Sequence, residues 1–138
     1  MRYVLAIALA AGLIAAGCGG DDDGDTLTKE EYISQADANC KKADKELDQS
    51  QGPQGANGLD EFVTGTLVPN IQGQVDFVQN LDGPEEVEDE VNPILDDAQA
   101  AIDQLEKQPS QLENGAAARD LQQAGQDLQE YGFEECGG

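Results

Sequence analysis

Four stretches of the chain place apolar side chains at the three- and four-residue spacing of one helix face. An α-helix has about 3.6 residues per turn, so this spacing gathers the apolar side chains on one side and predicts amphipathic helices. Segments that contain glycine or proline separate the stretches and predict loops. They are Gly52–Gly55, Leu81–Pro84 and Gln108–Ser110. Helices of this kind bury their apolar faces best against one another, so we predict an all-α fold, an antiparallel four-helix bundle.

The predicted helices are about 20 residues long, which corresponds to rods of roughly 30 Å. They cover residues 28–50, 57–78 (with a start between 57 and 60), 84–107 and 112–131. Thr28 and Glu31 predict a capping box at the start of the first helix. Pro69 and Pro93 should each kink or divide its helix, because proline lacks a backbone N–H and its ring clashes with the preceding turn. The last helix carries Ala117, Leu121, Ala124, Leu128 and Tyr131 on one face.

The first 17 residues predict a lipoprotein signal peptide. Arg2 precedes an uncharged, mostly apolar segment, residues 3–16, which is too short to span a bilayer comfortably. Small residues then lead to Cys18, and this order resembles a bacterial lipobox, with Ala15 where that motif usually has leucine. We therefore predict cleavage before Cys18 and attachment of lipid to it. The alternative is an ordinary secretory signal that leaves Cys18 as a thiol.

Removal of the signal peptide leaves an acidic chain with few large apolar residues. Arg2 is lost, so 6 basic and 29 acidic residues remain among residues 18–138, a net charge of −23. Leu, Ile, Val and Phe make up about 19% of these residues, which together with the high charge is typical of disordered chains. The apolar helix faces favour folding instead. We predict a flexible acidic tether over residues 18–27 and a folded domain over residues 28–138.

The other two cysteines predict a disulfide bond between Cys40 and Cys136. If Cys18 carries lipid, they form an even pair in an exported and therefore oxidising setting. Cys40 lies on the apolar face of the first predicted helix, which suits a structural disulfide better than a reactive thiolate. The bond would close nearly the whole folded region. The alternatives are two free thiols or pairing between molecules.

The residue types that common catalytic chemistry needs are missing or undifferentiated. The chain has no His, so Ser34, Ser50 and Ser110 have no imidazole base. Carboxylates occur on nearly every exposed helix face, and no pair stands out as general acid and base. We predict that the protein is not an enzyme, with no catalytic residues and no cofactor.

A dedicated metal site is not predicted either. Asp21, Asp23 and Asp25 alternate in the way that calcium ligands do. An EF-hand loop that starts at Asp21 would need glycine and glutamate where Thr26 and Tyr32 stand, so these residues do not match the calcium loop.

Four short motifs follow one another along the chain. They are Gly17-Cys18-Gly19-Gly20, Leu27–Ile33 leading to Cys40, Leu67–Ile71, and Tyr131–Gly137. In this arrangement the chain resembles small lipoproteins and secreted proteins of unknown function that are common in actinobacteria and their relatives. The resemblance covers most of the chain and implies an exported, lipid-anchored helical domain. It implies no particular activity.

A lipid anchor, a helical bundle and the lack of catalytic groups point to a binding or interaction module of the cell envelope. We expect attachment to the outer face of the cell membrane, which is a periplasmic face in a diderm host. Expected partners are the membrane, through the anchor, and an envelope protein, polymer or cation. The net charge of −22 argues against nucleic acid. The alternative is a carrier of a small ligand or divalent cation, with a cavity opened in the bundle by kinks at Pro69 and Pro93; the oligomeric state stays open.

Overall fold

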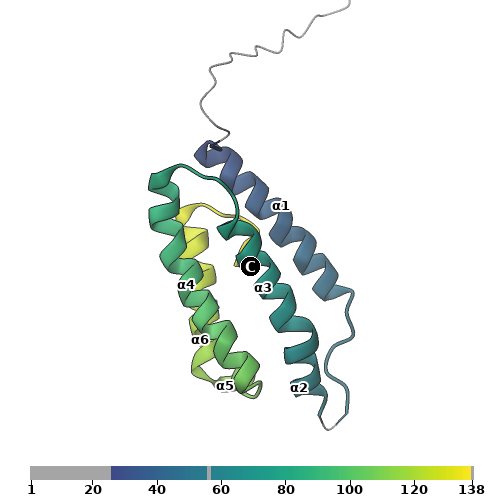
Figure 1. Ribbon diagram of the computed structural model, residues 1–138. Helices are drawn as coiled ribbons and strands as arrows, with labels where there is room; N and C mark the ends of the chain where they lie inside the picture. The colour runs from purple at the N-terminus through teal and green to yellow at the C-terminus, as the bar shows by residue number, and fades with distance from the viewer. Residues whose placement is uncertain (1–25, 56, 138) are drawn as a thin grey trace, which may run out of the picture.

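The computed structural model describes residues 26–55 and 57–137, and all regular secondary structure within them is helical. The elements are α1 (Lys29–Asp48), α2 (Gly58–Phe62), the π-helix η1 (Val63–Leu67), α3 (Val68–Gln79), α4 (Glu85–Lys107), α5 (Gln111–Asn114) and α6 (Ala116–Tyr131). They pack as a helical bundle (Figure 1). The predicted all-α class is therefore confirmed. The predicted signal peptide, the lipidation residue Cys18, the calcium candidates Asp21, Asp23 and Asp25, and residues 18–25 of the tether lie outside the described residues.

The start of α1 confirms the predicted capping box. The backbone N–H of Glu31 donates to Thr28 Oγ1 over 3.3 Å, and the backbone N–H of Thr28 donates to Glu31 Oε2 over 3.0 Å. These bonds satisfy two backbone donors that a helix start otherwise leaves without partners. Hydrogen bonds from the backbone and the hydroxyl of Thr28 lower the pKa of the Glu31 carboxyl.

Neither of the two helical prolines divides its helix with a loop. Helix α4 continues through Pro93. Around Pro69, the elements α2, η1 and α3 follow one another directly, and the N–H of Val68 donates to the carbonyl of Val63, five residues back. A proline ring clashes with the carbonyl four residues before it. The wider π-helical turn immediately before Pro69 changes the backbone at that point, so the helix continues.

The prediction of one continuous helix over residues 112–131 is wrong, because Gly115 separates α5 from α6. Gly115 has extended backbone angles, φ −82° and ψ 177°. Its N–H donates to the carbonyl of Gln111 over 2.9 Å. The backbone folds so tightly there that a Cβ atom on Gly115 would lie 2.4 Å from Gln111 Cβ. Helix periodicity does not detect this break, because apolar residues continue on both sides of it.

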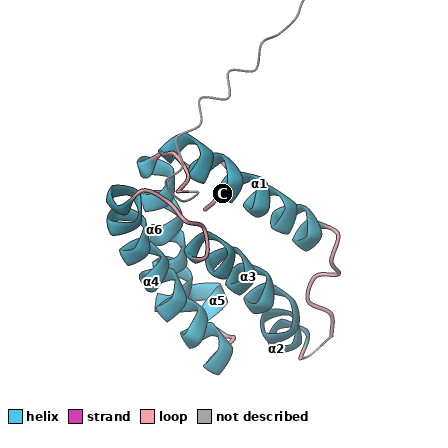
Figure 2. Cartoon of the chain, turned by 45° about the horizontal axis from the view of Figure 1, so that its top comes forward, coloured by secondary structure: helices cyan, strands magenta, loops and turns pink. Residues whose placement is uncertain are grey.

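The bundle is arranged around α4, which packs against α6 and α3, while α1 packs mainly against α3. In the predicted antiparallel four-helix bundle the first and last helices would be direct neighbours. Instead, the C-terminal tail, residues 132–137, lies between them and is bonded to α1 through Cys136. In Figure 2 the C-terminal end lies between α1 and the other helices. The tail therefore fills part of the space between α1 and α6, which make few direct contacts with each other.

Tyr32 holds one end of the bundle together. Its side chain is 1% exposed, and its hydroxyl donates to the carbonyl of Val78 at the end of α3 over 3.3 Å. Its ring meets the ring of Phe133 edge to face, with centroids 6.3 Å apart. Gly83, in the turn before α4, lies so close that a Cβ atom there would be 2.6 Å from Tyr32 Cδ2. One aromatic side chain thus joins α1 to α3, to the α3–α4 turn and to the tail.

Candidate functional site

A cavity of about 570 Å³ lies between α1, α3, α4 and α6, on the side where α1 and α6 make few direct contacts. Its volume falls within the range of about 300–1,000 Å³ that is typical of small-molecule sites. Most of its wall is apolar. The apolar lining is formed by Leu47, Leu67, Ile71, Val75, Val78, Leu95, Ala98, Leu121, Ala124 and Leu128. These residues come from α1, η1, α3, α4 and α6, so the cavity requires the assembled bundle.

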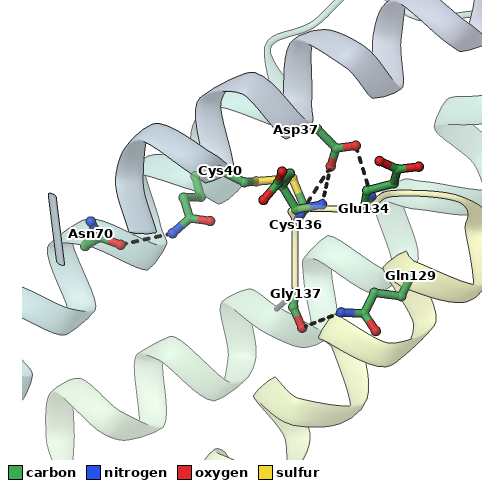
Figure 3. Close-up of a disulfide and its surroundings, with 9 residues drawn as sticks. Asp37, Cys40, Asn70, Gln129, Glu134, Cys136 and Gly137 are labelled. Carbon is green, nitrogen blue, oxygen red and sulfur yellow. Dashed lines mark hydrogen bonds between the residues drawn. A yellow bond between two sulfur atoms is a disulfide. The ribbon is translucent and has the colours of Figure 1, made fainter. Parts of the chain in front are cut away.

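Side-chain amides supply most of the polar groups in the cavity wall. Asn70 Nδ2 donates to the carbonyl of Ala43 over 2.8 Å, which ties α3 to α1. Gln74 Nε2 in turn donates to Asn70 Oδ1 over 2.9 Å, as the dashed line at Asn70 marks (Figure 3). Asp44 is the only charged side chain among the described residues that line the cavity. The wall is therefore apolar and amide-rich, with a single acidic group.

The disulfide bond predicted between Cys40 and Cys136 is present and borders the cavity (Figure 3). Both cysteines are 2% exposed, and their Cα atoms lie 5.2 Å apart. The bond joins the middle of α1 to the tail that follows α6. It therefore fixes one boundary of the cavity.

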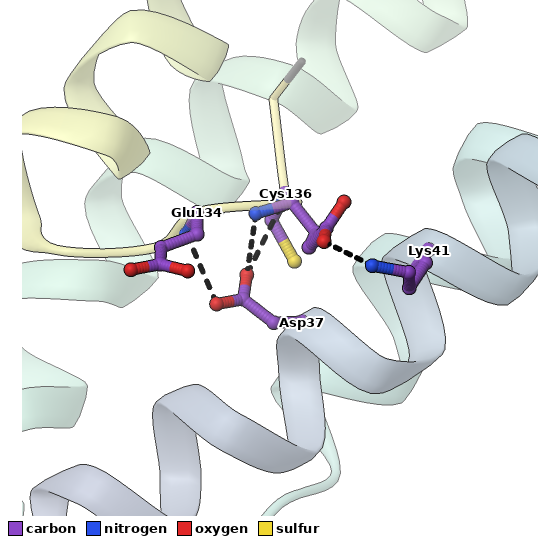
Figure 4. Close-up of polar contacts among 5 residues, drawn as sticks. Asp37, Lys41, Glu134 and Cys136 are labelled. Atoms are coloured by element: carbon purple, nitrogen blue, oxygen red, sulfur yellow. Dashed lines mark hydrogen bonds and ion pairs between the residues drawn. The ribbon is translucent and has the colours of Figure 1, made fainter.

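Asp37, one turn before Cys40, is a second attachment point for the tail. Its carboxylate accepts three backbone N–H groups, from Glu134, Glu135 and Cys136, over 3.0, 3.0 and 3.1 Å (Figure 4). Lys41 Nζ lies 2.5 Å from a carboxylate oxygen of Glu135, and this contact raises the pKa of Lys41. Sequence reasoning did not single out Asp37 in this role, because its partners lie almost 100 residues further along the chain.

The tail is held on α6 by a close backbone contact. A Cβ atom on Gly125 would lie 2.7 Å from the carbonyl oxygen of Gly137, so a larger residue there would displace the tail. Gly137 has φ +89°, a backbone conformation that favours glycine. Gln129 Nε2 donates to the Gly137 carbonyl over 3.2 Å (Figure 3). Together with the disulfide, these contacts position the tail between α1 and α6.

The other groups considered from the sequence do not enter the cavity. Ser50 donates its hydroxyl to the carbonyl of Leu47 over 2.6 Å, and Ser34 and Ser110 are exposed. Ser34 lies in a second hollow, which is lined by residues of α1 and the tail and whose acidic residues include Asp37 and Glu135. Within the part of the chain that the structure describes, no three Asp, Glu or Cys residues are grouped so that they could hold a metal ion. No helix in residues 26–55 and 57–137 is long and apolar enough to cross a membrane.

Comparison with protein-family models, with curated proteins and with solved structures finds no match to this chain. Its function is therefore inferred from the cavity, the surface and the N-terminal sequence.

Proposed function

We propose that this chain is an exported, lipid-anchored protein of the cell envelope that binds a small apolar ligand in the cavity beside its C-terminal tail. The observation that carries this proposal is the cavity itself, a space of about 570 Å³ with a mostly apolar wall. Burial of apolar surface stabilises a complex by roughly 25 cal/mol for each Å² removed from water. A ligand that fills such a space gains affinity without any catalytic group, so we propose a binding protein rather than an enzyme.

The outer surface supports the cavity as the binding site. Among the described residues, Phe77 is the one large apolar side chain that is exposed, at 37%. A single exposed apolar residue does not form a patch of the size that marks protein–protein or membrane contact sites. In the alternative, an interaction module, the acidic outer surface would bind a cation or a positively charged protein or polymer of the envelope. The cavity favours ligand binding over this alternative.

The anchored arrangement is supported by the N-terminal sequence. In this proposal residues 1–17 form the lipoprotein signal peptide, Cys18 carries the lipid, and residues 18–27 form a tether to an antiparallel bundle on the outer face of the membrane. Phosphatidylglycerol and other anionic lipids repel a chain whose residues 18–138 carry a net charge of −23, so the covalent lipid on Cys18 rather than the protein surface would hold it there.

The proposed anchor predicts a mass increase on Cys18. We expect the exported protein to begin at Cys18 and to carry a covalent lipid, detected by mass spectrometry of its N-terminal peptide. Cys18→Ala should abolish both the cleavage before residue 18 and the added mass. Cys40→Ala leaves the lipobox-like residues intact and should keep both the cleavage and the added mass. An unmodified Cys18 thiol at a free N-terminus would exclude the anchor.

The proposed cavity function predicts binding of a neutral apolar dye. Exported protein in phosphatidylcholine nanodiscs should enhance the fluorescence of phenylnaphthylamine after the signal of empty nanodiscs is subtracted. Leu121→Trp, which adds volume from the α6 wall, should weaken this binding by about tenfold or more, which corresponds to about 1.4 kcal/mol. Leu112→Trp makes the same replacement at a half-buried leucine of α5 that does not line the cavity, and should bind the dye normally.

Circular dichroism and a thermal melt show whether both variants keep the fold. Ala98→Leu adds volume from the α4 wall and should reproduce the loss of binding. The cavity function fails if the wild-type protein does not bind the dye, or if the variants at Leu121 and Ala98 bind it as the wild type does.

A further inference from the structure

We propose that the ligand is a cationic amphiphile, with its apolar chain in the cavity and its ammonium or other cationic head at Asp44. This inference rests on the proposed function, because it specifies the ligand class of the same cavity. Two observations carry it: the place of the one carboxylate in the cavity wall, and the distribution of the basic residues.

Asp44 is half-buried on α1, one turn after Cys40 and less than one turn before Leu47, both of which also line the cavity. The two ion pairs found among the described residues are Lys41–Glu135 and Lys42–Glu46, so neither neutralises Asp44. Partly buried charges without an ionic partner are costly and gain from an added opposite charge. A cation bound in the cavity beside Asp44 would provide that charge.

Burial raises the pKa of the Asp44 carboxyl, and the charges of Asp48 and Glu135 raise it further. A hydrogen bond from the Gln74 side chain acts in the opposite direction. These influences agree with the geometry, because they show a carboxylate whose charged form is only partly compensated by its surroundings.

The basic residues are placed so that an anionic head would find no partner in the cavity. None of the described lysines, nor Arg119, lines it. Residues 18–138 carry 29 acidic and 6 basic side chains, so their field also disfavours an anion in the cavity. The amides of Asn70 and Gln74 can hydrogen-bond any polar head and do not discriminate by charge. Charge complementarity therefore selects a cation over an anion of the same chain length.

The test uses three probes with the same eight-carbon alkyl chain: octylammonium, octanol and nonanoate. Each is titrated against protein in phosphatidylcholine nanodiscs that is loaded with the neutral dye, and dye displacement is measured. We expect octylammonium to displace the dye at about tenfold lower concentration than octanol, and nonanoate to be the weakest. In Asp44→Asn the advantage of octylammonium over octanol should disappear.

Asp48→Asn is the matched control, since it removes the same charge from the same helix at an exposed residue outside the cavity wall. It should keep the preference for octylammonium, and Asp44→Glu should keep it as well. Equal potency of octylammonium and octanol on the wild type would overturn the inference and leave the cavity function intact. Equal losses in Asp44→Asn and Asp48→Asn would also overturn it, because the preference would then come from the general surface charge. Failure of the dye itself to bind would instead refute the proposed function.

Discussion

The double variant Cys40→Ala/Cys136→Ala should have a free energy of unfolding about 4–5 kcal/mol below that of the wild-type protein. The disulfide joins residues 96 apart and so closes a loop that contains most of the described domain. A crosslink over a long loop removes many conformations from the unfolded chain, which raises its free energy relative to the folded state. A small domain has a total stability of only about 5–15 kcal/mol, so loss of the bond should remove a large share. Urea unfolding followed by circular dichroism measures the difference.

Reduction of the wild-type protein with a thiol is the matched control. It breaks the crosslink but keeps both buried sulfur atoms, and it should therefore separate the effect of the bond from the loss of packing at the alanines. The reductant should leave the unfolding curve of the double variant unchanged. A loss below about 1 kcal/mol in both experiments would mean that the contacts of the tail, among them the three N–H bonds to Asp37, hold the fold without the bond.

The sequence predicted the helical class well because its signals are local and repeated. Helix α1 lies within the predicted range 28–50, and α4 fills the range 84–107 to within one residue. In both, a cap or a proline marks the start, and apolar residues recur at helix spacing to the end. The disulfide was favoured by the number of cysteines, the expected export and the place of Cys40 on an apolar helix face, over the alternatives of free thiols or pairing between molecules.

The differences from the prediction arise where the outcome depends on contacts between distant segments. The break at Gly115 follows from the tight approach of its backbone to Gln111, and the π-helical turn before Pro69 relieves a clash that a helix pattern does not reveal. The spacing of α1 and α6 depends on the tail between them. The sequence predicted the bond from Cys136 to Cys40 but not that the tail lies between the two helices. None of these features has a periodic signal.

The cavity could be predicted only in part. Leu121, Ala124 and Leu128 share the apolar face predicted for the last helix, and the structure places them in the cavity wall. Periodicity identifies such a face but does not tell whether another helix covers it. The sequence does not distinguish Asp44 from the other acidic residues on exposed helix faces. Its place in the cavity wall depends on the separation of α1 from α6.

Tyr32→Ala should lower the free energy of unfolding by about 3–5 kcal/mol, the usual cost of removing a large buried aromatic side chain. The ring of Tyr32 is 1% exposed and contacts Phe133, Gly83 and the end of α3, so several elements lose a partner together. Tyr32→Phe keeps the ring and removes one hydrogen bond, and should cost about 1 kcal/mol at neutral pH. Urea unfolding of the two variants beside the wild type distinguishes ring packing from the hydroxyl.

The wild-type protein and Tyr32→Phe should also differ in alkaline solution. Burial of the hydroxyl, with the negative charge of Glu88 and a smaller contribution from Tyr131, raises the pKa of Tyr32 from 10.0 to about 12. The unfolded chain therefore releases this proton at lower pH than the folded chain. The contribution of the protonated Tyr32 hydroxyl to the free energy of unfolding is complete below pH 10 and is lost as the pH rises through 12. The urea midpoint of the wild type should fall more steeply over this interval than that of Tyr32→Phe. Parallel curves for the two proteins would contradict a buried Tyr32 hydroxyl, because the phenylalanine variant has no proton to release at this position.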